Sequence, residues 1–287
     1  MKKSRIVILS ALVLSVGILG GCSGNVSAAD TTAAQENVSV QETVSVQDTK
    51  TNESGYTGNQ VELAEMLDHF GDQEFIDANL SVKKQQLSIL ATLVTTMSYP
   101  QVKEQVGIAL DAGLTPIEIK EAIYQVAPYA GYQKAINAMA YADEMFEERG
   151  IEIPLESQAT VTDENRYEEG LAAQREIFGE NFAAITDDMS ESMKRRVAYV
   201  SEYSFGDFMT RTGLDDAERE LIVTCTIAAL GGADSQLSGH AAGSLTAGNT
   251  GDELLASVLL CASYNGFPRA LNAYGIINEV IAQAQAE

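Results

Sequence analysis

The sequence contains few residues of the types that bind metals or carry out thiol chemistry. It has 2 histidines, 3 cysteines and no tryptophan among 287 residues. Two histidines and no Cys-x-x-Cys pair cannot supply the ligand cluster of a zinc site. Cys225 and Cys261 each stand alone in an apolar run, which is typical of buried inert thiols, although a disulfide between them stays open. We therefore expect no metal and no organic cofactor.

Basic residues are also scarce. The chain carries 18 lysines and arginines against 41 aspartates and glutamates, a formal net charge of −23. This charge disfavours binding to nucleic acid and lying flat against an anionic membrane. We expect a small-molecule partner and no nucleic acid.

The N-terminus has the pattern of an export signal. Three basic residues within the first five positions precede an apolar run over residues 6–19. The run ends in small residues before Cys22, which resembles a lipobox and predicts a lipoprotein signal peptide over residues 1–21. Cys22 would then carry two ester-linked chains, enough for stable anchoring to the outer face of the cell membrane. Ordinary secretory cleavage near residues 26–28 is the alternative.

Composition divides the remaining chain. Residues 22–59 are rich in polar residues with valine and lack aromatic residues until Tyr56, so we expect a disordered tether. Residues 60–150 and 166–287 are predicted to be two helical repeats, with residues 151–165 as the linker between them. Almost every segment after the tether has apolar residues at helical spacing, which predicts an all-α fold.

A duplicated motif supports the two repeats. Gln236-Leu237-Ser238-Gly239-His240 is followed by Ala247-Gly248 and then by a Tyr-x-Gly segment over residues 264–273. A weaker copy of this series, with the motif segments 101–105, 112–113 and 129–138, lies about 135 residues upstream. Self-similarity at a fixed spacing indicates that one supersecondary unit was built twice. A pseudo-symmetric chain of this kind is expected to close into a homo-oligomer, such as a trimer of tandem repeats or a higher assembly.

Helix signals recur at matching places in the two copies. We expect helices over residues 82–97 and 102–110, and amphipathic segments over residues 167–178 and 193–203. Thr115 with Glu118, and Thr250 with Glu253, have the spacing of capping boxes. Glu118 and Glu253 are therefore interpreted as structural caps rather than as catalysts.

The two copies differ where chemistry would lie. His240 of the second copy is Gln105 in the first, and an imidazole is the side chain best suited to acid–base chemistry near neutral pH. Arg219 and Glu220, whose counterparts are Gln85 and Gln86, are its candidate companions on a facing helix. Glu220 would orient the imidazole. Arg219 and Gln236, which lies one turn before His240, would bind the substrate, and Arg219 would do so through the substrate carboxylate. The alternative is that Arg219 and Glu220 form a surface pair, and that His240 is structural.

These motifs resemble the carboxymuconolactone decarboxylase family in its tandem-repeat form, over roughly residues 61–284. The segment Phe205–Asp215 is similar to the family's FGDxWxRxGLD motif, with Met209 in place of the tryptophan. Arg219 matches the family's arginine, the Leu-x-x-His motif ends at His240, and Tyr264, Gly266, Pro268 and Ala270 match YxGxPxA.

The resemblance implies one of two chemistries on an alkylhydroperoxidase-like helical fold. In the decarboxylase branch, a histidine at the place of His240 protonates carbon as carbon dioxide leaves a carboxylated unsaturated lactone. In the alkylhydroperoxidase branch, a Cys-x-x-Cys pair precedes the histidine, and Ala233 and Gln236 stand at those places here. We expect a cofactor-free lyase or isomerase, a binding protein without turnover as the alternative, and a thiol peroxidase last because its nucleophile is absent.

Overall fold

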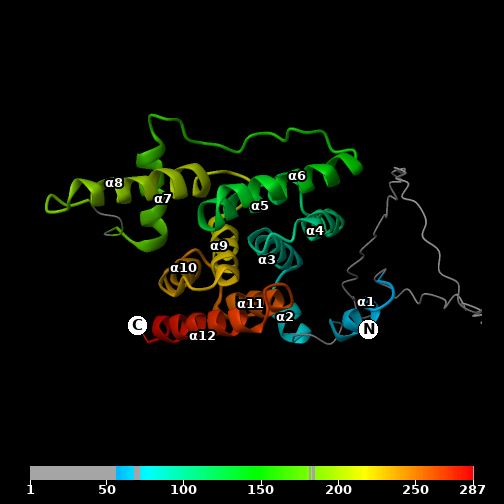
Figure 1. The fold of residues 1–287 in the computed structure, drawn as a ribbon. Coiled ribbons are helices and arrows are strands. Elements are labelled where there is room, and N and C mark those ends of the chain that lie inside the picture. The colour runs from blue at the N-terminus through cyan, green and yellow to red at the C-terminus, as the bar shows by residue number, and fades with distance from the viewer. Residues whose placement is uncertain (1–55, 68–71, 181, 183–184, 287) are drawn as a thin grey trace, which may run out of the picture. The chain divides into compact units, whose positions relative to one another are not determined.

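The computed structural model describes residues 56–67, 72–180, 182 and 185–286, and these residues form helices and no β-strand (Figure 1). The predicted signal peptide, Cys22, most of the tether and His69 lie outside the described residues. The chain divides into two compact units after Met66, near the end of helix α1 (Gln60–Leu67). No helix among the described residues combines the length and apolar character that crossing a membrane requires.

The all-α prediction is confirmed, and the helices follow one another in a repeated order. The first series is α2 (Gln73–Asn79), α3 (Val82–Thr95), α4 (Tyr99–Asp111), α5 (Pro116–Ala130) and α6 (Tyr132–Glu148). After the helix-free residues 151–165, the chain forms α7 (Arg166–Phe178), α8 (Glu191–Val200) and the π-helix η1 (Ser201–Met209). The second series ends the chain with α9 (Asp216–Leu230), α10 (Asp234–Thr246), α11 (Gly251–Asn265) and α12 (Phe267–Ala284).

Local sequence signals set the helix ends. The predicted capping boxes are present, because Thr115 and Thr250 accept from the backbone N–H of Glu118 and Glu253, whose carboxylates accept in return. A third box at Asp215 and Glu218, which the sequence pattern had not suggested, starts α9. Glu118 and Glu253 therefore cap helices.

Three expected helices have other bounds in the structure. The helix expected over residues 102–110 is α4, which begins at Tyr99 and has a proline in its first turn. The helix expected over residues 82–97 ends at Thr95, because Met97 takes a left-handed backbone with φ of 61°. The amphipathic segment expected over residues 193–203 divides into α8 and the π-helix η1. A π-helix repeats about every 4.4 residues rather than 3.6, so a helical-period search does not find it, and π-helical turns often mark functional sites.

The two series of helices interlock in the core (Figure 1). Helix α3 packs against its counterpart α9, while α5 of the first series packs on α9 and α11 of the second packs on α3. Tyr129 at the end of α5 accordingly packs against the core cluster of the second series, and Tyr264 of α11 against that of the first. The second series is therefore completed by a helix of the first.

Candidate active site

His240 and Glu220 are brought together by the α9–α10 hairpin. The chain reverses through Gly231 and Gly232, both at positive φ, so that α10 packs on α9. The Nδ1 atom of His240 lies 2.9 Å from Oε2 of Glu220, which is fully buried, while the imidazole keeps 14% of its side-chain surface exposed. The expected pairing of these two side chains from facing helices is present.

Two aromatic rings meet the imidazole edge-on. Tyr129 lies 5.0 Å from His240 between ring centroids, and Phe178 of α7 lies 5.4 Å away, at interplanar angles of 89° and 87°. Gly243, one turn after His240, makes room for this packing, since an added Cβ would come within 2.7 Å of the Phe178 ring. Sequence reasoning missed both Tyr129 and Phe178 as neighbours of His240, because neither lies on α9 or α10.

Two buried polar atoms at this pair have no hydrogen-bond partner among the described residues. They are Oε1 of Glu220 and the Thr224 hydroxyl, one turn further along α9. An unpaired buried polar atom costs free energy, so these atoms are candidates to contact a ligand or ordered water. Burial, followed by the negative charge of Glu220, raises the pKa of Tyr129, which therefore stays a neutral phenol.

The two nitrogens of the imidazole have different environments, because Nδ1 contacts Glu220 and Nε2 does not. A carboxylate accepts hydrogen bonds only, so Glu220 in its ionised form fixes the proton of His240 on Nδ1. The second nitrogen, Nε2, is then free to take a proton from a bound molecule or to give one to it. The arrangement is chemically that of an oriented general acid–base.

The first series of helices carries an uncharged counterpart of this pair. Nε2 of Gln105 donates to Oε1 of Gln86, and both amides are buried. A hydrogen bond between α3 and α4 thus replaces the imidazole–carboxylate contact between α9 and α10. At these two positions the described residues of the first series therefore carry no ionisable group.

The guanidinium of Arg219 lies buried among polar groups of the core. It is fully buried and donates to Oε1 of Gln125, to Oε2 of Glu121 at 3.4 Å, and to the backbone carbonyls of Arg211 and Thr212. Burial outweighs the nearby charge of Glu121 and lowers the pKa of Arg219. Nε of Arg219 is buried without a hydrogen-bond partner among the described residues. Because the whole side chain is buried, the geometry gives no support to substrate binding by Arg219. The surface-pair alternative for Arg219 and Glu220 does not hold either, because both are fully buried.

Glu121 is the residue that Arg219 contacts and that sequence reasoning missed. It is fully buried on α5, and Arg211 also binds it through two hydrogen bonds of 2.8 and 2.9 Å. The available signal was a second carboxylate on α5, three residues after the capping Glu118, together with Arg211 in the segment similar to the family motif.

The other candidate residues lie apart from this pair. Gln236 is exposed and accepts from the hydroxyl of Ser235 at 3.0 Å. Cys225 and Cys261 are buried free thiols, so the disulfide that the sequence left open is not formed in this structure. Within the described part of the chain, no group of histidine, cysteine, aspartate and glutamate residues is placed to hold a metal ion.

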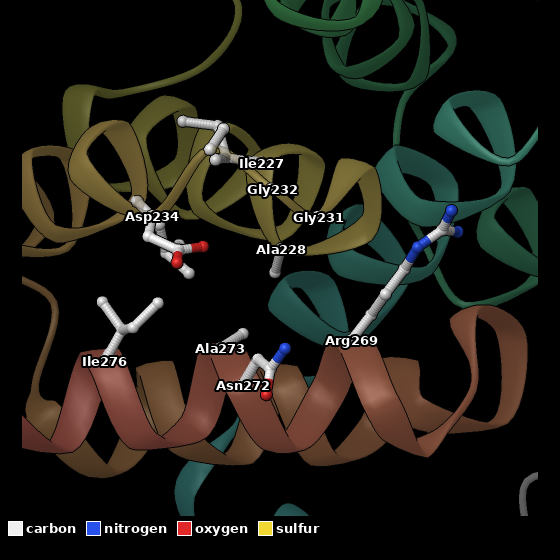
Figure 2. Close-up of a pocket in the computed structure, with 11 residues that line it drawn as sticks. Ile227, Ala228, Gly231, Gly232, Asp234, Arg269, Asn272, Ala273 and Ile276 are labelled. Carbon is white, nitrogen blue, oxygen red and sulfur yellow. The ribbon is translucent and has the colours of Figure 1, made fainter.

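A small cavity lies beside the loop that leads into α10 (Figure 2). Its volume is about 30 Å³, and its walls include Gly231, Asp234, Arg269 and Asn272. The side chains of Asn272 and Ile276 reach it from α12, as Figure 2 shows. This volume holds one or two water molecules rather than an organic acid, and neither His240 nor Glu220 lines it.

A known protein family matches the chain in two places. The profile of the Carboxymuconolactone decarboxylase family covers residues 62–144 and again residues 197–279. The chain is also 29% identical over 121 residues to 4-carboxymuconolactone decarboxylase of Acinetobacter baylyi (strain ATCC 33305 / BD413 / ADP1). That alignment covers 42% of this chain and 90% of the relative.

Proposed function

The chain belongs to the carboxymuconolactone decarboxylase family, and from this premise we propose that it is a cofactor-free lyase or isomerase that acts on a small carboxylated lactone or a similar acid. The observation that carries the proposal is the contact of 2.9 Å between Nδ1 of His240 and the buried carboxylate of Glu220. The similarity to 4-carboxymuconolactone decarboxylase supports the substrate class.

In the proposed reaction, His240 moves a proton at Nε2. For a carboxylated unsaturated lactone, the bond between carbon and carboxylate breaks, carbon dioxide leaves, and the electron pair spreads into the conjugated lactone. Protonated His240 then gives its Nε2 proton to carbon, and water returns a proton to the imidazole. Glu220 stabilises the imidazolium that precedes this transfer, as a buried carboxylate beside a histidine does in other acid–base sites.

The aromatic neighbours support the same step. Phe178 and Tyr129 place apolar surface against the imidazole, and a substrate carboxylate loses its charge as carbon dioxide forms. A site that excludes water favours the step in which that charge disperses. Apolar surroundings can therefore assist the reaction although Arg219 is not available to hold the acid.

The test is turnover of a carboxylated lactone by the purified protein. We expect 4-carboxymuconolactone to release carbon dioxide, and His240→Gln, which copies the first series, to lower kcat by about 10²- to 10⁴-fold. Gln105→Met is the matched control, because it changes the equivalent position of the other series. Equal turnover by His240→Gln and the parent protein would remove the acid–base role.

A second candidate is a binding protein without turnover. The burial of Arg219 favours this alternative, because it leaves the proposed reaction without the cation expected to hold the substrate carboxylate. Calorimetry separates the two, since a binding protein would retain affinity for the lactone in a preparation that releases no carbon dioxide.

We also propose that the protein is exported and lipid-anchored through Cys22, and that it forms a homo-oligomer. Exposed apolar side chains at equivalent places on two helices support assembly: Tyr132 and Ile136 on α6, and Phe267 and Leu271 on α12. Mass spectrometry of the mature N-terminus tests the acylation of Cys22, and light scattering of the soluble part tests the assembly. An unacylated Cys22 or a monomer at micromolar concentration would refute the respective proposal.

A further inference from the structure

A larger cavity lies between α5, α6 and the helix-free segment that follows α6. Its volume is about 300 Å³, ten times that of the cavity in Figure 2. Its walls are formed by seven side chains: Lys120, Tyr124, Met139, Asp143, Ile153, Pro154 and Leu155. None of these residues contributes to the His240 site, and a cavity of this size accommodates a small organic molecule.

The one lysine in the wall is almost fully buried. Lys120 is 5% exposed, and its Nζ donates to the backbone carbonyl of Glu156 and lies 3.7 Å from Oε1 of Glu121. Burial lowers the pKa of Lys120, against the raising effect of Glu121. An ammonium group has three N–H donors, so one remains available to a molecule in the cavity.

Cations outnumber carboxylates among the closest charged contacts of Lys120 in the described residues. The carboxylate of Glu121 is shared by three cations, since Lys120, Arg211 and Arg219 all lie within 4 Å of it. More distant charges of Glu156 and Asp216 act on Lys120 and Arg219 respectively. Three cations on one carboxylate within 4 Å attract a further anion at short range, whereas Glu156, Asp216 and Asp143 of the cavity wall oppose it from further away.

The remaining wall suits the body of an organic acid. The Arg211 guanidinium lies 5.3 Å and the Lys120 ammonium 5.9 Å from the centre of the Tyr124 ring. Met139, Ile153 and Leu155 add apolar surface. Asp143 is the one carboxylate in the wall; burial and then the charge of Glu147 raise its pKa, and in its ionised form it opposes a bound anion.

The fold itself does not require charges here. In the second series, the residues equivalent to Lys120 and Glu121 are Leu255 and Ala256, and both are buried. The same helix therefore packs with apolar side chains at these positions. The lysine and glutamate at these positions occur in the first series only, just as the histidine and glutamate of the candidate active site occur in the second series only.

We propose that this cavity binds a small organic monocarboxylate with a compact apolar body, its carboxylate on Nζ of Lys120. This binding site is separate from the His240 site, and it does not depend on the function proposed there.

Calorimetry of the full-length protein with benzoate as the probe tests this site. We expect saturable binding of benzoate and none of benzamide, which has nearly the same shape without the charge. Lys120→Met should weaken benzoate binding by about tenfold or more, the effect of losing one hydrogen bond to a charged group. Asp143→Asn should strengthen it at neutral pH, because it removes the competing negative charge.

Control variants distinguish this cavity from the protein surface and from the His240 site. Lys103→Met removes a lysine that pairs with Glu144 and Glu148 on the surface, and it should leave binding unchanged. If Lys120→Met fails to fold, Asp143→Asn and a cavity-filling Leu155→Trp still decide the matter, the second by abolishing binding. Equal binding of benzoate and benzamide, no binding of either, or no response to these variants would overturn the proposal. The proposal would also be overturned if His240→Gln lost benzoate binding while the cavity variants kept it, because benzoate would then bind at the His240 site.

Discussion

Two glycines of α10 should respond in opposite directions to the same substitution. Gly239 and Gly243 lie one turn apart, on either side of His240. A Cβ at Gly239 would meet nothing within 4 Å, whereas a Cβ at Gly243 would lie 2.7 Å from Cε1 of Phe178 and 2.8 Å from Cγ2 of Ile177. Alanine at the first position therefore changes only the helix backbone, and alanine at the second also forces α7 and α10 apart.

The magnitudes follow from these two situations. Replacing glycine by alanine inside a helix stabilises it by about 0.5–1 kcal/mol, so Gly239→Ala should raise the free energy of unfolding by that amount. Overpacking a well-packed contact costs about 1–3 kcal/mol, which exceeds the same gain at Gly243. We expect Gly243→Ala to be about 0.5–2 kcal/mol less stable than the parent protein.

Urea denaturation followed by circular dichroism measures both effects. The parent protein and both variants would be compared at equal concentration, with the midpoint and the slope of each transition recorded. Because Phe178 also contacts the imidazole, Gly243→Ala should lower turnover, and Gly239→Ala serves as its control. Equal stability of the two variants would show that Phe178 and Ile177 do not pack against α10 as described.

Three further predictions concern stability and thiol reactivity. Burial opposes ionisation of Glu118, but its contacts with Lys83 and Thr115 outweigh burial and lower its pKa. The contribution of Glu118 to the free energy of unfolding should therefore be present above about pH 4.5 and disappear as the pH falls through the lowered pKa. In denaturant titrations, Glu118→Gln should reduce this dependence of the free energy of unfolding on acid pH. Phe146 is fully buried, and Phe146→Ala should cost about 3–5 kcal/mol in the free energy of unfolding, measured by urea denaturation. Cys225 and Cys261 are buried free thiols, and they should react with a thiol reagent only after denaturant is added; fast reaction in the native protein would contradict their burial.

Sequence patterns determined most of the architecture. The helical class and the capping boxes at Thr115 and Thr250 depend on residues close together in the chain. Such signals are local, so they can be found without tertiary contacts. The sequence also singled out His240 and Glu220, because the comparison of the two copies showed ionisable side chains in one and amides in the other.

Only the tertiary structure decided which side chains meet at the candidate sites. Tyr129 and Phe178 reach His240 from α5 and α7, and Arg219 turns to Glu121, 98 residues earlier in the chain. Short-range spacing carries no information about contacts of that separation, since they depend on how the two series of helices interlock. The sequence by itself determined that the second copy holds a histidine and a glutamate where the first holds amides, and packing decided that Arg219 contacts Glu121 and Gln125 in the core.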